Sequence, residues 1–272
     1  MTKKYTSEKP PFFEGQKSAE AQNVSANSNV NVVKKSDREI RLNKFIANAG
    51  ICSRREADTL IEKGEVKVNG QVVTSLGFKV TTKDEIEYKG KTISAEKKVY
   101  VLLNKPKGFV TTMDDPHAEK KVTSLVKNAC EERIYPVGRL DKDTTGLLMF
   151  TNDGELTKKL THPSYEKKKI YHVFLDKEFT QIDLDQVKKG IELEDGFIAA
   201  DAISYVEAED KRQVGIEIHS GKNRIVRRIF AHLGYRVVKL DRVVFAGLTK
   251  KKLARGKWRF LTDKEVGFLK MS

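Results

Sequence analysis

The chain has 272 residues, of which 52 are lysine or arginine and 38 are aspartate or glutamate, so its formal net charge is +14. This length supports one large domain or two unequal ones, and no apolar run approaches the roughly 18–20 residues that a membrane span needs. The two cysteines, Cys52 and Cys130, lack metal-ligand spacing, which argues against a disulfide scaffold and a zinc site and favours a reducing cytoplasm.

Residues 1–37 are rich in serine, asparagine, lysine, glutamate and glutamine and contain few large apolar residues. Such a segment cannot bury enough apolar surface to offset the entropy lost on ordering, so we predict a disordered tail. No apolar stretch follows its first lysines, and a secretory signal is therefore not expected.

Residues 38–93 are predicted to form a small domain. Apolar residues between Leu42 and Ala49 recur at the spacing of one helix face, and the segment Ser53-Arg54-Arg55-Glu56 fits a capping box at the start of a second helix. The dipeptide Asn69-Gly70 between two short apolar segments predicts a β-hairpin.

This segment, RLNKFIANAGICSRREADTLIEKGEVKVNG, resembles the small αL RNA-binding domain first described in a ribosomal protein of the small subunit. The resemblance covers the helix-turn-helix and the first strand; the alternative is an amphipathic helical hairpin without an RNA-binding role. The resemblance implies an RNA-facing set of basic residues on the outer side of the domain. These are Lys44, Arg54, Arg55, Lys63 and Lys67.

Strands and turns dominate residues 98–272. Continuous apolar runs at 99–105 and 146–151 predict buried strands, and the alternation at 170–175 predicts a half-buried one. Residues 225–233 have helical spacing instead. Strands and helices in this order predict an α+β domain on a largely antiparallel sheet.

The positive charge is concentrated near the C-terminus. From Lys222 to Arg259 there are thirteen lysines and arginines against one acid, Asp241, so this stretch alone carries a net charge of +12. Strand-like apolar residues such as Val237 and Val244 lie among them, so we expect a folded segment that presents its cations on one rigid surface. Such a surface suits a nucleic-acid backbone; the alternative is a solvated face without a partner.

The segment Gly138-Arg139-Leu140-Asp141 is the first candidate for chemistry. Glycine permits a tight turn, and a carboxylate follows between Arg139 and Lys142. An acid on a loop beside cations is expected to stay ionised and to act as a nucleophile or a base. On spacing alone, Asp141 could equally be a surface cap or a surface ion pair.

The wider sequence GRLDKDTTGLLMFTNDGEL (138–156) resembles the active-site signature of RNA pseudouridine synthases. Further segments resemble the same family in the same order: NKPKG (104–108), KIYHV (169–173), GKNRIVRRIFAHLGY (221–235), KLDRV (239–243) and GKWRFLT (256–262). Together with the small domain, the resemblance covers residues 41–262. It implies the pseudouridine synthase fold, an α+β fold with a largely antiparallel mixed sheet.

The branch that the sequence resembles contains the small-subunit enzyme and the RluB, RluE and RluF types, all acting on ribosomal RNA. TNDGELTKKLTHPS (151–164) and GIELEDG (190–196) are most similar to the RluB type, which isomerises a uridine in 23S, large-subunit, ribosomal RNA. The alternatives are a small-subunit enzyme of the same branch and a non-catalytic RNA-binding factor in ribosome assembly. A glycoside hydrolase would need a paired second acid, for which the sequence offers no motif.

The resemblance also assigns roles to single residues. It makes Asp141 the nucleophile, attacking either the ribose C1′ or the base C6. Tyr171 is the aromatic residue that stacks on the flipped base and assists proton removal, Arg227 pairs with Asp141, and Arg139 occupies the space that the uridine leaves. Contacts with RNA phosphate are expected for Lys105, Lys222, Arg224 and Arg228.

A second segment, Lys239-Leu240-Asp241-Arg242, imitates the Asp141 motif. The resemblance gives Asp241 no role and leaves Arg242 as an RNA or structural contact.

Isomerisation of uridine involves no redox change and no group gain, so no cofactor and no metal are expected. The expected partner is ribosomal RNA, bound in the cytoplasm by a monomer that makes no membrane contact, with the target base extruded from its stack.

Overall fold

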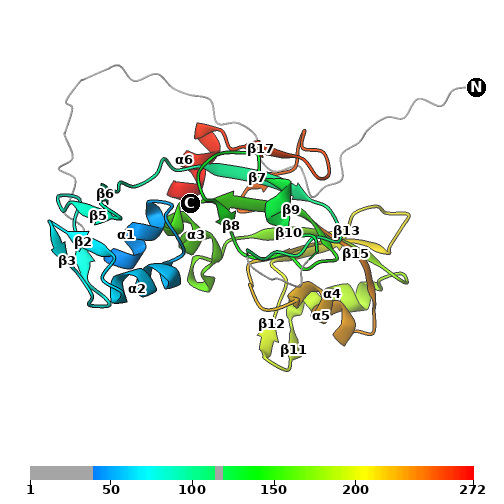
Figure 1. The fold of residues 1–272 in the computed structure, drawn as a ribbon. Coiled ribbons are helices and arrows are strands. Elements are labelled where there is room, and N and C mark those ends of the chain that lie inside the picture. Colours follow the sequence, from blue (N-terminus) through cyan, green and yellow to red (C-terminus); the bar gives the residue numbers. More distant parts are fainter. Residues whose placement is uncertain (1–38, 114–118) are drawn as a thin grey trace, which may run out of the picture. The chain divides into compact units, whose positions relative to one another are not determined.

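The computed structural model describes residues 39–113 and 119–272 (Figure 1). The tail expected at 1–37 lies outside these residues. The described chain divides into two compact units, and the boundary falls between Lys98 and Val99.

The first unit, residues 39–98, contains two helices and two small sheets. Its elements are β1 (Ile40–Arg41), α1 (Leu42–Asn48), α2 (Arg54–Glu62), β2 (Val66–Val68), β3 (Gln71–Val72), β4 (Lys79–Val80), β5 (Ile86–Tyr88) and β6 (Lys91–Thr92). One sheet has the order β3-β2-β5-β6, and β1 pairs with β4. Leu42 and Ile46 of α1 and Ala57 and Ile61 of α2 are buried together in its core.

The predicted start of α2 is confirmed in detail. The backbone N–H of Ser53 donates to the Glu56 carboxylate at 2.6 Å, and the N–H of Glu56 donates to the Ser53 hydroxyl at 3.3 Å. These two bonds satisfy backbone donors that the first helical turn leaves without partners. The hairpin at Asn69-Gly70 is also confirmed, since Val68 of β2 pairs with Gln71 of β3.

The second unit, residues 99–272, is built on one large sheet with the strand order β13-β14-β10-β15-β9-β7-β17. Its elements are β7 (Tyr100–Lys105), η2 (Val122–Leu125), β8 (Tyr135–Pro136), β9 (Thr144–Thr151), α3 (Gly154–Thr161), η3 (Pro163–Tyr165), β10 (Lys169–Leu175), α4 (Gln181–Lys189), β11 (Ile191–Leu193), β12 (Gly196–Ile198), β13 (Ala202–Tyr205), β14 (Gln213–Ile218), α5 (Ile225–His232), β15 (Val237–Phe245), β16 (Leu248–Thr249), β17 (Trp258–Phe260) and α6 (Asp263–Met271). Within the described residues, neighbouring strands of this sheet are antiparallel except β9 and β15. The predicted α+β class and mixed, largely antiparallel sheet are confirmed.

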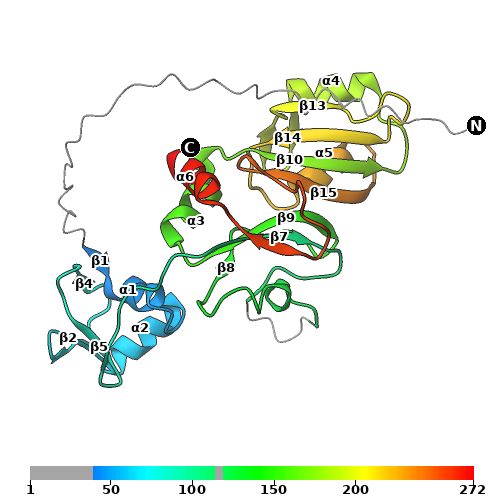
Figure 2. The same cartoon turned by 90° about the horizontal axis from the view of Figure 1, so that it is seen from above.

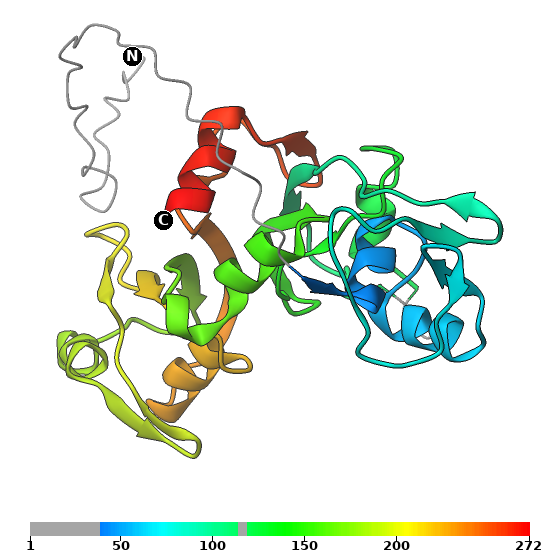
Figure 3. The same ribbon diagram turned by 90° about the vertical axis from the view of Figure 1, so that its left-hand side faces the viewer.

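Side chains that alternate along the strands fill two cores. Leu103 of β7 belongs to the larger core with α4 and α5, whereas its neighbour Leu102 belongs to a smaller core with α3 and α6. Helices α3 and α6 lie side by side (Figure 2), and Lys159 Nζ of α3 donates to the Lys270 carbonyl of α6 at 2.6 Å. The β11–β12 hairpin projects from the sheet beside α5 (Figures 1 and 3).

Candidate active site

A loop between β8 and β9, residues 138–143, carries Asp141; we call it the Asp141 loop. Gly138 opens it with a φ of +73°, a conformation that other residues rarely adopt. The N–H of Thr144 donates to the Asp141 carbonyl at 3.0 Å and closes the turn. The Thr111 hydroxyl donates to the Leu140 carbonyl at 2.7 Å, so the segment that follows β7 also holds the loop.

Lys105, the last residue of β7, is fully buried beneath this loop. Its Nζ donates to the carbonyl oxygens of Thr144 at 2.8 Å, Asp141 at 3.0 Å, and Lys142 and Pro106 at 3.3 Å each. Burial lowers the pKa of its ammonium from 10.5 to about 8. This differs from the phosphate contact expected from the sequence, because a buried ammonium directed at backbone carbonyls presents no donor to RNA. Lys105 instead fixes the backbone at Asp141 and in the three residues that follow it.

Asp141 faces a pocket that also receives side chains from β10, β15 and the segment before α5. Its lining includes Thr144, Lys169, Tyr171, Leu240, Arg242 and Phe245. Tyr171 is 9% exposed and packs into the larger core of the unit. Arg139, Lys222 and Arg224 also line the pocket, so the fold brings five of the residues singled out in the sequence to one place: Arg139, Asp141, Tyr171, Lys222 and Arg224.

Two arginines approach the Asp141 carboxylate, and their order differs from the expectation. Arg224 Nη1 lies 3.4 Å from Asp141 Oδ2, whereas Arg227 Nε lies 3.9 Å from it. Arg227 donates from Nη1 to the Val237 carbonyl at 3.0 Å instead of forming a two-bond fork with the carboxylate. Its pKa is lowered by burial and, secondly, by the neighbouring charge of Arg224. Arg224 is therefore the closer partner of Asp141, and Arg227 joins α5 to the start of β15.

Arg228 and Lys222 both contact Asp195 and stay partly exposed, with side-chain exposures of 29% and 32%. Arg228 donates from Nη2 and Nη1 to the two carboxylate oxygens of Asp195 at 2.6 and 2.8 Å, and Lys222 Nζ donates to the Asp195 carbonyl at 2.7 Å. Hydrogen bonding by Arg228 lowers the pKa of Asp195 to about 2. Asp195 lies in the turn of the β11–β12 hairpin, so both cations attach that hairpin to the start of α5. Nothing in the sequence around Asp195 indicated a partner 33 residues away.

Lys169 was not singled out by sequence, although it lies in the KIYHV segment. Its Nζ donates to the carbonyls of His219 at 2.7 Å and Ser220 at 3.3 Å. Burial, with a second contribution from the charge of Arg242, lowers its pKa to about 8. The contact ties the start of β10 to the segment that leads into α5.

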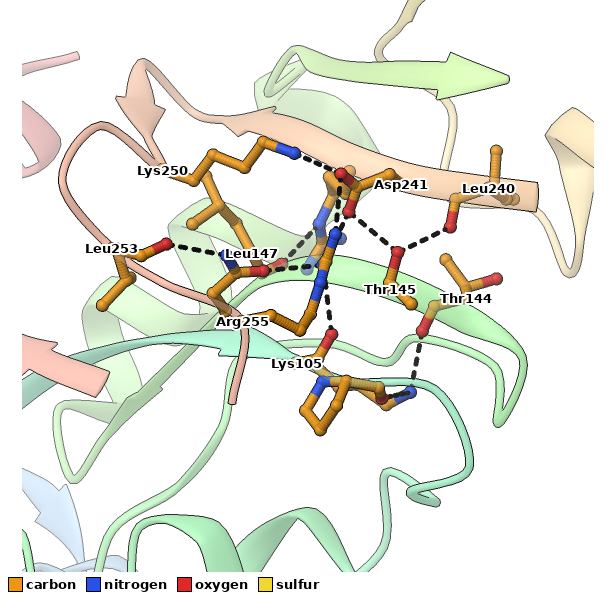
Figure 4. A network of polar contacts seen from close by, with 12 residues as sticks. Lys105, Thr144, Thr145, Leu147, Leu240, Asp241, Lys250, Leu253 and Arg255 are labelled. Carbon is orange, nitrogen blue, oxygen red and sulfur yellow. Dashed lines mark hydrogen bonds and ion pairs between the residues drawn. The ribbon is translucent and has the colours of Figure 1, made fainter. Parts of the chain in front are cut away.

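Asp241, given no role by the resemblance, is the centre of an ionic network (Figure 4). Thr145 Oγ1 donates to its Oδ1 at 2.9 Å, Arg255 donates to both of its oxygens at 2.9 and 3.1 Å, and Lys250 Nζ also donates to it. Arg255 Nη1 further donates to the Asn104 side-chain oxygen at 2.7 Å and the Lys105 carbonyl at 3.4 Å. This network, hereafter the Asp241 network, connects β15 and β9 to β7.

In the first unit, the residues expected to face RNA differ in exposure. Arg54, Arg55, Lys63 and Lys67 are exposed, and Lys44 is half-buried. Within the described parts of the chain, no three histidine, cysteine or acidic side chains cluster in a way that could hold a metal ion. No helix of residues 39–113 or 119–272 is long and apolar enough to cross a membrane.

Comparison with protein families identifies both units. Residues 99–232 match the model of the RNA pseudouridylate synthase family, and residues 40–86 match the S4 domain. Ribosomal large subunit pseudouridine synthase B of Bacillus subtilis is 45% identical over 229 residues, which are 83% of this chain and 93% of that protein. Dual-specificity RNA pseudouridine synthase RluF of Escherichia coli is 36% identical over 233 residues, which are 85% of this chain and 78% of that protein.

A solved structure supports the same assignment of the fold. A crystal structure of a pseudouridylate synthase is 30% identical, with a TM-score of 0.60, and the match covers 85% of this chain and 99% of the solved one. An uncharacterised RNA pseudouridine synthase of Aquifex aeolicus is 42% identical over 234 residues, covering 85% of this chain and 94% of that protein.

Proposed function

Since the chain belongs to the RNA pseudouridine synthase family, we propose that it isomerises a uridine of 23S ribosomal RNA, with Asp141 as the nucleophile on an extruded base. The RNA target is carried over from the Bacillus subtilis relative, whose name assigns it to the large ribosomal subunit. The observation that carries the chemical proposal is the position of Asp141 in the pocket that Tyr171 also lines, next to Arg224.

The reaction exchanges one bond for another. The N1–C1′ bond breaks, the base turns, and a C5–C1′ bond forms, while C5 loses a proton and N1 gains one. Substrate and product are therefore isomers. A base stacked in folded RNA exposes neither C1′ nor C5 to a protein side chain, so it must leave its stack to enter the pocket.

Four residues in or near the pocket have a proposed task in this reaction. The Asp141 carboxylate bonds to the ribose C1′ or to the base C6, and Lys105 keeps its backbone in place through the loop carbonyls. The Tyr171 ring stacks on the base, and its hydroxyl assists removal of the C5 proton. Arg139, which is exposed at the rim of the pocket, takes the space in the RNA that the uridine vacates.

The two units divide the work in this proposal. Residues 38–93 bind RNA through the exposed cations Arg54, Arg55, Lys63 and Lys67, with Lys44 beside them, and residues 98–272 carry out the reaction. Each phosphate that a cation neutralises releases counterions, so binding is expected to weaken steeply with salt. The proposed location is the cytoplasm, where ribosomal RNA is assembled, and the proposed active form is a monomer.

Carbodiimide mapping of pseudouridine in ribosomal RNA tests this function. Ribosomal RNA from a strain that lacks the gene is compared with RNA from the same strain after the gene is restored. We expect one 23S position to lose its carbodiimide stop without the gene and to regain it with the gene. A position in small-subunit RNA would redirect the proposal to the other subunit, and an unchanged map of both RNAs would refute it.

A further inference from the structure

Two residues that line the Asp141 pocket each carry a buried polar atom that has no hydrogen-bond partner among the described residues. These atoms are Nη2 of Arg242 and the hydroxyl oxygen of Thr144. Arg242 is 3% exposed and Thr144 is 2% exposed. A buried donor without a partner costs about 1–3 kcal/mol, and more when it is charged, so such groups call for an explanation.

The two groups are neighbours in the sheet. β15 and β9 run parallel, with Leu240 opposite Thr144 and Arg242 opposite Gly146. On its other side, β15 places Arg242 opposite Tyr171 of β10. β15 therefore lies between β9, which begins shortly after Asp141, and β10, which carries Tyr171. The two unpartnered groups belong to β9 and β15.

The Arg242 guanidinium is held in place through its Nε and its Cζ. Its Nε donates to the Leu147 carbonyl at 2.8 Å, and its Cζ lies 4.5 Å from the centre of the Phe245 ring. Gly146 leaves room for this arrangement, because a Cβ there would lie 2.3 Å from the Arg242 carbonyl oxygen. The side chain is thus fixed in place, while its buried Nη2 has no hydrogen-bond partner among the described residues.

We propose that Arg242 and Thr144 form a polar subsite that binds the carbonyl oxygens of the extruded uracil and stabilises the charge that the ring carries during isomerisation. This inference rests on the proposed function, because it takes the Asp141 pocket as the place where the base is bound. It makes Arg242 a catalytic residue, since its Nη2 would touch the reacting base.

The chemistry of the base supports this assignment. When the N1–C1′ bond breaks, the base keeps the bonding electron pair, which is delocalised from N1 over the two ring carbonyl oxygens. The charge disappears when C5 bonds to C1′, C5 loses its proton and N1 takes one up. A guanidinium fixed in a buried pocket stabilises such a transient anion strongly, because it needs no reorganisation when the charge develops. The Thr144 hydroxyl can donate to a carbonyl or accept from a ring N–H.

The test uses the full chain and ribosomal RNA from a strain that lacks the gene, labelled with tritium at C5 of uridine. Release of tritium reports the loss of the C5 proton, and enzyme in excess over RNA isolates a single turnover. The variants are Arg242→Gln, Arg242→Lys and Thr144→Val. The matched control is Arg212→Gln, which removes an exposed arginine that pairs with Asp210.

We expect Arg242→Gln to lower the single-turnover rate constant about 10²–10³-fold, as loss of one donor to a developing anion does in other enzymes. Arg242→Lys restores about tenfold of this loss, and the control matches the wild type. RNA affinity stays within about threefold throughout. Equal rates for Arg242→Gln and the wild type, or a loss confined to RNA affinity, would overturn the proposal.

Thr144→Val keeps the test decisive if Arg242→Gln does not fold. A hydroxyl without a partner contributes nothing to folding, so an isosteric valine should leave the melting temperature unchanged or raise it. The subsite nevertheless predicts a rate about five- to tenfold slower. A wild-type rate for Thr144→Val together with a wild-type rate for Arg242→Lys would reject the subsite. Absence of tritium release by the wild type itself would instead contradict the proposed function.

Discussion

Two segments of the chain share one pattern, a basic residue followed by leucine, aspartate and a second basic residue, and the fold uses them differently. Residues 139–142 lie on a loop, and the carboxylate of Asp141 lines the pocket with a side-chain exposure of 32%. Residues 239–242 lie in β15, and the side chain of Asp241 is 15% exposed within its ionic network. The same four-residue pattern therefore does not by itself place an aspartate in a pocket.

The difference comes from the number of donors that each carboxylate meets. Hydrogen bonds from Thr145, Arg255 and Lys250 occupy both oxygens of Asp241. Burial alone would raise the pKa of Asp241, but the bonds from Arg255 and Lys250 lower it to about 2. Among the described residues, Asp141 accepts one side-chain hydrogen bond, from Arg224 at 3.4 Å. A carboxylate whose lone pairs are occupied is a poor nucleophile, so Asp241 is suited to holding strands together and Asp141 to bonding with a substrate.

The largest effect is expected for Asp141→Asn. The amide cannot form the covalent link, so the single-turnover rate constant for tritium release should fall at least about 10⁴-fold. RNA affinity should stay within about threefold, because the substitution removes no cation. Filter binding at matched salt measures the affinity, and a variant that keeps a tenth of the wild-type rate would refute the assignment.

Lys105 lies between the two aspartates, and Lys105→Met is expected to have the next largest effect among the substitutions that test this contrast. Its ammonium holds the Asp141 loop, while its carbonyl accepts from Arg255 of the Asp241 network. Without the ammonium, the carbonyls of Asp141, Lys142, Thr144 and Pro106 lose this donor, and the displaced Asp141 should react about 10- to 100-fold more slowly. The Michaelis constant for RNA should not change. A loss of RNA affinity with an unchanged rate would support the phosphate contact that the sequence suggested.

Asp241→Asn should affect stability more than chemistry. The substitution leaves the cations Lys250 and Arg255 with a neutral partner, and both are partly exposed, with side-chain exposures of 34% and 41%. We expect the free energy of unfolding to drop by about 2 kcal/mol in urea titrations. The single-turnover rate should remain within about tenfold of the wild type below the melting temperature. A loss of activity as large as that of Asp141→Asn would show that the two aspartates do not differ in their roles.

The smallest effect is a pH dependence that isolates Lys105. The folded protein releases this proton near pH 8, whereas the unfolded chain keeps it until about pH 10.5. Between these values the unfolded state binds more protons, so the free energy of unfolding rises with pH, by at most about 1.4 kcal/mol per unit for one proton. Below pH 8 Lys105 is charged in both the folded and the unfolded state, so the free-energy cost of burying its ammonium is present in full. In Lys105→Met the slope should be smaller by up to this amount, and parallel curves for the two proteins would disprove the lowered pKa.

Features set by neighbouring residues were predictable from the sequence. The capping box at Ser53 and Glu56 and the hairpin at Asn69-Gly70 depend on three or four residues, and the structure has both. The strand at 99–105 was likewise apparent as an apolar run and corresponds to β7. Local hydrogen bonds and side-chain periodicity determine these features, so a short window contains the necessary information.

Features that depend on tertiary contacts were not predictable. Lys105 was expected to contact phosphate, because the sequence gives no sign that four carbonyl oxygens converge on its ammonium. Arg228 was expected to do the same, yet it pairs with Asp195. In the pocket, the resemblance indicated Asp141 and Tyr171, but the Nη2 of Arg242, which has no partner among the described residues, became visible only when β9, β10 and β15 were placed beside one another.

The most direct test of the central claim compares the two aspartates in cells. A strain lacking the gene receives the wild-type gene, Asp141→Asn or Asp241→Asn, each expressed to the same level, and carbodiimide mapping then reads the pseudouridines of its ribosomal RNA. The account predicts that Asp241→Asn restores the missing modification and that Asp141→Asn does not. Restoration by Asp141→Asn would show that the carboxylate in the pocket is not the nucleophile.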